Sequence, residues 1–341
     1  MSKLLLIDGN AILHRAFHAI PPLTTPNQEP INAVYGFVSI LLNVIQNLKP
    51  THLAVCFDEK EKTFRHIEFP EYQSQRPPTH DDLSSQFGKA RDFLKASNIP
   101  IYSKSGFEAD DVIGTIATKA ANMEDRGVKP ERKNENRSMK FDRTSEFNNQ
   151  SSFQSSDIKH QTSFNEIVII TGDRDILQLV DDKKNIKLFM PVGGLSNGKI
   201  YGEAETIERM GVPPSQIVDL KALTGDSSDN YFGVRGIGPK TAINLLQCYV
   251  TLKQIYKNLD KISEKVREKL IKGEKDAQMS YKLATIVKDV PVKIDFDEMD
   301  KWNLGSNEVL KLFQEFGFKT LTQRIISVSK KIDDEKQGNL F

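Results

Sequence analysis

Acidic residues follow short apolar runs at five places in this chain of 341 residues. The segments are LLLIDG, AVCFDEK, GFEADDVIG, VIITGDRD and TGDSSDN. So many carboxylates would destabilise an ordinary hydrophobic core, because like charges repel one another and are costly to desolvate. A fold that gathers them must hold cations among them. The acidic residues concerned are Asp8, Asp58, Glu108, Asp110, Asp111, Asp173, Asp175, Asp226 and Asp229.

The residue types and their spacing indicate which cations these are. Carboxylate oxygens without His or Cys partners favour Mg²⁺ or Mn²⁺ over zinc. Two such ions about 4 Å apart can clamp the attacking and leaving oxygens of a displacement at phosphorus. Glu108 and Asp111 have the three-residue spacing that places two side chains on one helix face, as do Asp226 and Asp229. The pattern predicts a two-metal phosphodiesterase site.

Each acidic residue taken alone has a plainer interpretation. Asp110 or Asp226 could only cap a helix, and Asp58 could only begin a turn. Asp173 and Asp175 would face the same way if their turn stayed extended. No capping or turn requirement predicts acidic clusters at successive strand ends, so the joint pattern favours the metal site.

The elements that must position these residues alternate between strands and helices. Leu4–Ile7, Leu53–Phe57 and Ile167–Ile170 are short apolar runs typical of buried parallel strands. The helical periodicity between them predicts helices at Ala33–Leu48, Asp82–Ala96 and Ala109–Ala121. We therefore expect an α/β fold with the acidic residues at the carboxyl ends of its strands, where open sheets bind ligands.

The composition divides the rest of the chain. Residues 123–163 are rich in Asn, Ser, Gln and charged residues, so we expect a disordered surface insertion there. Beyond Gly202 the chain becomes helical and rich in lysine. We expect an α/β core over 1–200, a helical subdomain over 201–325 and a tail over 326–341. The candidate helices are Ala204–Met210, Ser215–Leu223, Thr241–Gln247 and Leu252–Leu259.

Composition also excludes some classes of protein. The two cysteines, Cys56 and Cys248, support neither a disulfide framework nor a zinc site, so a reducing cytoplasm fits best. The first apolar run is too short to span a bilayer and lacks a signal-peptide pattern, so no membrane role is indicated. The formal net charge is +1. If the acids gather in one cleft, a basic surface should lie beside it, which suits a phosphate-bearing polymer.

A second motif is the segment GIGPKTA at residues 236–242, which looks like the turn of a helix-hairpin-helix. Gly236 and Gly238 let the backbone approach a ligand closely. The following helix N-terminus, Lys240 and Thr241 can then hold a phosphate. Such contacts bind the nucleic-acid backbone without reading its bases.

These segments, together with HRAFHAIPPLT, THLAVCFD, KTFR, YQSQRPP and GVPPSQIVDLKALTGDSSDN, carry a family resemblance. Over roughly residues 3–290 the chain resembles the 5' nuclease domain of bacterial DNA polymerase I and, more broadly, the flap endonuclease superfamily. The resemblance implies a PIN-like parallel-sheet domain with a helical helix-hairpin-helix (H3TH) subdomain. It implies metal-dependent cleavage of 5' flaps and 5' ends of DNA or RNA primers during replication and repair. It also implies a helical arch that threads the strand, and K⁺ bound by carbonyls near the Gly236–Lys240 turn.

The resemblance assigns roles to individual residues. Arg15, Tyr72 and Arg76 match positions that hold the scissile phosphate and stack the terminal nucleotide. The acids match two metal clusters. The first consists of Asp8, Asp58, Glu108, Asp110 and Asp111, and the second of Asp173, Asp175, Asp226 and Asp229.

Gln73 departs from the family pattern, which has a catalytic lysine directly after the tyrosine. Glutamine can hydrogen-bond to a phosphate but brings no charge to the transition state. We therefore expect slowed cleavage, with help from Lys62 or Arg76. The alternative is a protein that binds flap DNA and cuts it poorly. A ribonuclease of the related small metal-nuclease fold is a further alternative, which the helix-hairpin-helix disfavours.

The C-terminal residues QGNLF resemble the short peptide by which bacterial replication proteins dock on the sliding clamp. Gln337, Leu340 and Phe341 would make that contact, although a chance apolar terminus is the alternative. No polymerase region follows the nuclease segments, so we expect a stand-alone, monomeric nuclease.

Overall fold

A six-stranded sheet forms the centre of the computed structural model, which describes residues 2–123, 164–191 and 198–338. Its strand order is β3-β2-β1-β4-β5-β6, and all neighbours are parallel except β5 and β6. The predicted insertion at 123–163 lies outside the described residues, apart from Met123. The strands are β1 (Lys3–Asp8), β2 (His52–Cys56), β3 (Ile101–Tyr102), β4 (Glu166–Ile170), β5 (Ile186–Pro191) and β6 (Gly198–Tyr201).

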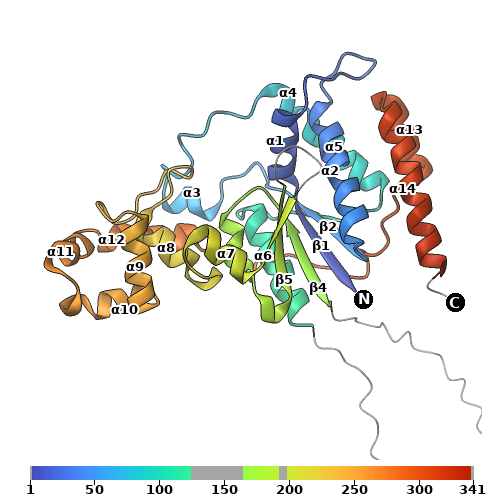
Figure 1. Cartoon of the computed structure of the whole chain (residues 1–341). Coiled ribbons are helices and arrows are strands. Elements are labelled where there is room, and N and C mark those ends of the chain that lie inside the picture. The colour runs from blue at the N-terminus through green and yellow to red at the C-terminus, as the bar shows by residue number, and fades with distance from the viewer. Residues whose placement is uncertain (1, 124–163, 192–197, 339–341) are drawn as a thin grey trace, which may run out of the picture.

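Both faces of this sheet are covered, which explains why its central strands are apolar throughout. Leu5 and Ile7 face one buried cluster, and their neighbours Leu4 and Leu6 face the other. The three predicted strands are confirmed by β1, β2 and β4, whose pairing is parallel and in register. The sheet is therefore the rigid middle layer of an α/β sandwich (Figure 1).

Helices of the α/β part lie on the two faces and above the sheet edge. On one face α2 contacts both α1 and α5, and on the other α6 packs against β1, β2 and β4. The predicted helix at Ala109–Ala121 matches α6, whereas the one at Asp82–Ala96 is divided into α4 and α5. The helices are α1 (Gly9–Ala19), α2 (Asn32–Leu48), α3 (Phe64–Glu68), α4 (Asp81–Ser84), α5 (Gln86–Ala96) and α6 (Ala109–Ala121).

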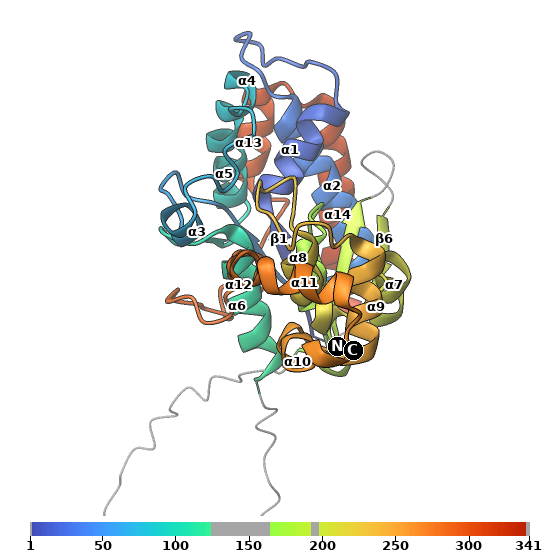
Figure 2. The same ribbon diagram turned by 90° about the vertical axis from the view of Figure 1, so that its left-hand side faces the viewer.

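A second group of helices extends from one side of the sheet, as Figures 1 and 2 show. Within it α8 contacts α9, α10 and α12. The short 3-10 helices η3 (Pro214–Gln216) and η4 (Leu259–Lys261) lie in this group, whereas η1 (Asp175–Leu179) and η2 (Asp182–Lys184) lie between β4 and β5. The helices are α7 (Glu203–Met210), α8 (Ile217–Thr224), α9 (Pro239–Tyr249), α10 (Leu252–Lys257), α11 (Glu264–Lys272) and α12 (Glu274–Ala284).

After α12 the chain returns to the α/β part. This arrangement differs from the expected one, in which a helical subdomain continues to residue 325 and a tail begins at residue 326. α13 (Asn307–Phe316) packs against α5, and α14 (Lys319–Gly338) packs against α2. Phe313, Ile325 and Val328 are buried in the same cluster as the sheet residue Leu5. The segment expected as a tail is therefore largely helical up to Gly338. Among the described helices, none is long and apolar enough to cross a membrane.

Candidate metal and nucleic-acid site

Adjacent strand ends bring the first acidic residues together. Asp8 ends β1, and its Oδ1 accepts a hydrogen bond from Ala11 N at 2.9 Å, which caps α1. The Thr171 hydroxyl, just after β4, donates to Asp8 Oδ2 at 2.7 Å. A Cβ on Gly9 would meet the Phe57 ring at 2.4 Å, so glycine permits the close packing of α1 on the chain after β2. The predicted convergence at this sheet edge is present.

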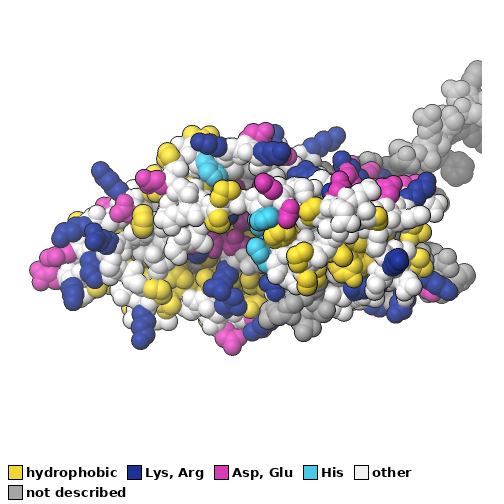
Figure 3. Space-filling view, turned by 90° about the horizontal axis from the view of Figure 1, so that it is seen from above, with side chains coloured by type: hydrophobic (Ala, Val, Ile, Leu, Met, Phe, Trp, Pro, Cys, Tyr) yellow, Lys and Arg dark blue, Asp and Glu magenta, His cyan; other side chains and the backbone are white. Residues whose placement is uncertain are grey.

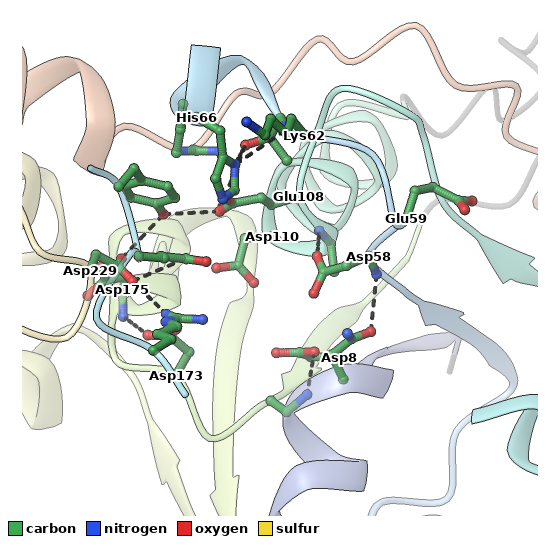
Figure 4. Close-up of a pocket in the computed structure, with 18 of the residues that line it drawn as sticks. Asp8, Asp58, Glu59, Lys62, His66, Glu108, Asp110, Asp173, Asp175 and Asp229 are labelled. Atoms are coloured by element: carbon green, nitrogen blue, oxygen red, sulfur yellow. Dashed lines mark hydrogen bonds and ion pairs between the residues drawn. The ribbon is translucent and has the colours of Figure 1, made fainter. Parts of the chain in front are cut away.

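The start of α6 supplies the next carboxylates. Asp58 Oδ1 accepts from Ala109 N at 2.7 Å, which ties the end of β2 to the first turn of α6. Glu108 is the N-cap of this helix, and Asp110 follows in its first turn. Figure 4 shows Asp110 directed into the cavity that Asp8 and Asp58 also line, whereas the Glu108 carboxylate is turned the other way and accepts a hydrogen bond from the Tyr72 hydroxyl at 3.3 Å.

Asp111 is not part of this cavity wall, contrary to the predicted ligand set. Its side chain is fully buried, and Arg65 donates to both of its oxygens, at 2.7 and 2.9 Å. Val287 N donates to Asp111 Oδ1 as well, at 2.8 Å. Although Glu108 and Asp111 are one turn apart, the buried guanidinium directs Asp111 into a structural ion pair instead of toward the cavity.

A second acidic group lies where η1 meets the loop after α8. One oxygen each from Asp175, Asp226 and Asp229 lie within 4.8 Å of one another, a spacing that can hold a metal ion. Gly225 has φ +72°, and a Cβ there would meet Gly233 N at 2.5 Å, so glycine lets the two sides of this loop touch.

Asp173 accompanies this group, but its turn is not extended as we had required. Asp173 Oδ1 accepts from Asp175 N at 2.8 Å, and Asp175 begins the 3-10 helix η1. Figure 4 nevertheless places both Asp173 and Asp175 on the wall opposite Asp8 and Asp58. The local geometry of this turn therefore differs from the expected one, but the acidic side chains gather as predicted.

All these side chains except Asp111 and Asp226 line a single cavity of about 650 Å³. Acidic side chains are recessed at the centre of the molecule in Figure 3, and Lys and Arg lie on the surface around them. The helical part carries many of these cations, for example Lys261, Lys265 and Lys272, which are exposed. The predicted acidic cavity is therefore present, and exposed lysines lie outside it together with exposed acidic residues such as Glu264 and Glu268.

Crowding and burial oppose ionisation of these carboxylates. Desolvation, reinforced by neighbouring carboxylates, raises the pKa of Asp8, Glu108 and Asp175 to about 7. Burial also raises the pKa of Asp110 well above its usual value. Asp58 opens onto the cavity, yet desolvation by the surrounding protein raises its pKa too. Such a cavity favours bound cations, because they would permit full ionisation.

The residues matched to substrate contacts are held by the acids. Arg76 Nη2 lies 2.5 Å from Asp229 Oδ1, and Gln73 Nε2 donates to the same oxygen at 3.1 Å. The Arg76 side chain is half exposed, so it can reach a ligand. Arg15, on α1, lines a shallow surface hollow that Asp173 also lines. Its Nε is buried and has no hydrogen-bond partner among the described residues.

Tyr72 lines the cavity but is largely covered by other side chains. Its ring is 4 % exposed and stacks on Tyr231, with centroids 6.4 Å apart and planes at 18°. The Tyr72 hydroxyl donates to Glu108 and Asp229, at 3.3 Å each. Tyr231 and His66 contact the ring, and Tyr72 also lines the cavity, so its stacking on a nucleotide stays a prediction.

The predicted helix-hairpin-helix turn leads into α9. Gly236 has φ +82°, Gly238 is the N-cap, and Pro239 is the first helical residue. Lys240 and Thr241 follow in the first turn, and Lys240 is exposed. This N-terminus has no side-chain cap within the described chain.

Lys269 of α11 reaches the same turn, and sequence reasoning missed it. Its Nζ donates to the Gly236 carbonyl at 2.8 Å. One of the carbonyls expected to bind K⁺ therefore already has a cationic partner.

Two further residues were missed at the acidic cavity. Arg65 lies in the segment KTFR, which carried the resemblance, but nothing in its spacing showed its partner. Lys221, on α8, lies 2.6 Å from Asp175 Oδ1 and also ion-pairs with Asp226. Its position five residues before Asp226 was the only available signal.

Of the predicted docking residues, Gln337 falls in the last turn of α14. Leu340 and Phe341 lie outside the described residues.

The fold and the cavity define an α/β protein with a carboxylate-lined site that could hold metal ions, and sequence comparison identifies the family. A family model described as the 5'-3' exonuclease N-terminal resolvase-like domain matches residues 3–129. A second, described as the 5'-3' exonuclease C-terminal SAM fold, matches residues 212–307. The 5'-3' exonuclease of Aquifex aeolicus is 30% identical to this chain, and the match covers 100% of both sequences. The chain belongs to the 5'-3' exonuclease family.

Other relatives are longer. DNA polymerase I of Caldicellulosiruptor bescii is 37% identical over 95% of this chain and 33% of its own length. DNA polymerase I of Bacillus subtilis is 33% identical over 98% of this chain and, again, 33% of its own length. The chain thus spans about a third of the length of these polymerases.

Solved structures share the fold. The bacteriophage T5 D15 flap endonuclease in a complex with DNA and metal ions has a TM-score of 0.59 at 18% identity, covering 96% of this chain and 99% of its own. The catalytic core of Rad2 in complex with a DNA substrate has a TM-score of 0.52 at 12% identity, covering 97% and 92%. At these identities the comparison establishes the fold alone.

Proposed function

We propose that this chain is a divalent-metal-dependent, structure-specific 5' nuclease. It hydrolyses phosphodiester bonds at nicks, 5' ends and 5' flaps of DNA, and of RNA primers, in replication and repair. The observation that carries the proposal is the single cavity lined by Asp8, Asp58, Asp110, Asp175 and Asp229. Membership of the 5'-3' exonuclease family supports it.

The donor set fits Mg²⁺ or Mn²⁺, because it consists of carboxylate oxygens. When bound, such ions would make water a better nucleophile and neutralise charge that develops on the phosphate. The residues assigned to the first ion are Asp8, Asp58, Glu108 and Asp110, and those assigned to the second are Asp173, Asp175, Asp226 and Asp229.

The chain's own cations orient the substrate in this proposal. Arg76 is half exposed at the cavity and presents a planar fork suited to two phosphate oxygens. Arg15 adds a second guanidinium near Asp173. Tyr72 helps to hold Glu108 and Asp229 at the cavity through its hydroxyl.

The helical part binds the duplex. The backbone N–H groups at the start of α9, together with Gly236, Gly238, Lys240 and Thr241, contact a phosphate without reading a base. The K⁺ predicted at this turn would share the Gly236 carbonyl with Lys269.

Clamp docking through Gln337, Leu340 and Phe341 is also part of the proposal, as are a monomeric state and a cytoplasmic location. A chain shortened by its last five residues should lose binding to an immobilised sliding clamp while still cutting flaps. Retained clamp binding would contradict the docking proposal.

A labelled double-flap DNA tests the nuclease function. We expect a 5' product with Mg²⁺, none with EDTA, and a rate lower by on the order of 10²–10³ for Asp110→Asn. The exposed Asp81→Asn of α4 is the matched control and should cut normally. Binding of the flap without any Mg²⁺-dependent product would instead support the flap-binding alternative that Gln73 favours. Parallel RNA flaps separate a ribonuclease from a flap nuclease.

A further inference from the structure

Lys221 places a positive charge inside the second acidic group. Its Nζ lies 2.6 Å from Asp175 Oδ1 and ion-pairs with Asp226 Oδ2. The side chain is 16% exposed, so the ammonium has little access to solvent. Because oxygens of Asp175, Asp226 and Asp229 lie within 4.8 Å of one another, the ammonium occupies part of the space that a metal ion there would need.

The third carboxylate of this group also has a cationic partner. Asp229 Oδ1 accepts from Arg76 at 2.5 Å and from Gln73 at 3.1 Å, and Asp229 Oδ2 accepts from Tyr72 at 3.3 Å. All three carboxylates are therefore paired with side chains of the protein. The group is largely compensated in charge before any ion arrives.

The opposite wall of the cavity is different. Asp8 is bonded by a backbone N–H and a hydroxyl, and Asp58 by the N–H of Ala109. Within the described chain, neither these two residues nor Asp110 makes an ion pair with Lys or Arg. Neutral donors do not cancel the negative charge of these carboxylates, so only a proton or a bound cation can compensate it there.

We propose that Lys221 is an internal counter-ion that competes with a divalent cation for Asp175 and Asp226. The second group then binds its ion more weakly than Asp8, Asp58 and Asp110 bind theirs. A metal ion must displace the ammonium, because both need the same carboxylate oxygens and two cations repel each other at that distance. This inference rests on the proposed function, since it assumes that the cavity takes divalent ions.

Calorimetric titration of the full chain with Mn²⁺, in the absence of DNA, tests the proposal. We expect a tight and a weak class of site in the wild type. Lys221→Met keeps the length of the side chain and removes its charge, so it should tighten the weak class at least tenfold and leave the tight class unchanged. Lys301→Met is the matched control, because Lys301 pairs with the exposed Glu298 far from the acidic group, and it should behave as the wild type. A weak class that is unchanged or weaker in Lys221→Met would overturn the proposal.

A second measurement does not depend on the folding of that variant. In the wild type labelled at lysine Cε, the resonance that is missing from Lys221→Arg should shift when Mg²⁺ is added. A resonance that stays in place would show that the ammonium is not displaced. The failures are distinguishable: a wild type that binds no Mn²⁺ contradicts the nuclease proposal itself, whereas two classes of site insensitive to Lys221 contradict only this role.

Discussion

At the scale of single residues, Gln73 is the most informative departure from the family pattern. It adopts φ +56° and donates to Asp229, so its side chain is already at the cavity. A lysine in the same place would add a charge beside the substrate phosphate, and charge-assisted contacts are stronger than neutral ones.

Gln73→Lys should therefore raise the single-turnover rate of flap cleavage about tenfold, equivalent to ~1.4 kcal/mol in the barrier. Gln75→Lys is the control, because it adds the same charge two residues away at an exposed position. Equal rates for the wild type and Gln73→Lys would mean that the missing charge does not limit cleavage.

Ionisation of the cavity residues predicts an unusual pH dependence. Burial raises the pKa of Asp8, Glu108 and Asp175 to about 7, whereas such groups titrate near 4 in an unfolded chain. The folded state thus binds more protons between these values, so the free energy of unfolding falls as the pH rises through this window. Asp226 acts in the opposite direction only at lower pH: although burial opposes it, bonds from Lys221 and Ser228 lower its pKa.

In EDTA, the Tm of the protein should consequently fall between pH 5 and pH 8. Mg²⁺ at pH 8 should raise the Tm again, because bound ions stabilise the ionised carboxylates. Asp175→Asn should show a smaller fall, since one of the raised groups is gone. A metal-free Tm that is constant from pH 5 to pH 8 would contradict this account of the cavity.

The sequence predicted which residues gather but not where each side chain points. Asp8, Asp58 and Asp173 converge because parallel strands end at a common edge, which is a property of local pattern and topology. Asp111 turns away because Arg65, 46 residues earlier, binds it. Contacts between distant residues leave no trace in spacing, so the stacking of Tyr72 on Tyr231 and the ion pair of Lys221 with Asp175 were not predicted.

At the scale of elements, Arg65 connects three helices around the cavity. From α3 it binds Asp111 of α6, and its Nε donates to Leu283 O of α12 at 2.8 Å. The Arg65 side chain is 3% exposed, so this ion pair is buried.

Arg65→Ala should lower the free energy of unfolding by about 3–5 kcal/mol, because it leaves the buried carboxylate without its partner. Lys184→Ala removes the exposed pair with Asp181 and should cost about 0–1 kcal/mol. Urea denaturation measures both. A loss in Arg65→Ala no larger than that of the surface control would contradict the assigned connecting role.

Element prediction succeeded for three buried strands and α6 but missed β5, although five of its six residues are buried. The central strands and α6 followed from their apolar runs, whereas β6 was missed because three of its four residues are exposed. α13 and α14 were placed in the wrong part of the molecule. Their partners are α5 and α2, more than two hundred residues earlier, and only packing in three dimensions selects them.

At the scale of the whole molecule, a group of acidic side chains is recessed at the centre, and Lys and Arg lie on the surface together with other Asp and Glu side chains (Figure 3). The recessed acids and the exposed cations let a nearly neutral chain hold cations and bind a polyanion at the same time. Lys240, at the turn before α9, is the cation that the sequence predicts to contact the backbone of duplex DNA.

Lys240→Ala should weaken binding to flapped and plain duplex DNA alike, and should reduce the slope of log K against log salt by about 1. Lys301→Ala, in the segment before α13, should leave the slope unchanged. Fluorescence anisotropy at several KCl concentrations measures this. An unaltered slope for Lys240→Ala would show that Lys240 does not contact the DNA, contrary to the prediction.

The central claim is that the gathered carboxylates hold divalent ions. Anomalous diffraction from a crystal soaked in Mn²⁺ tests it most directly. We predict one strong peak among Asp8, Asp58 and Asp110, and a weaker one between Asp175 and Asp229. A cavity without anomalous density, in a crystal that binds Mn²⁺ only on its outer surface, would contradict the account.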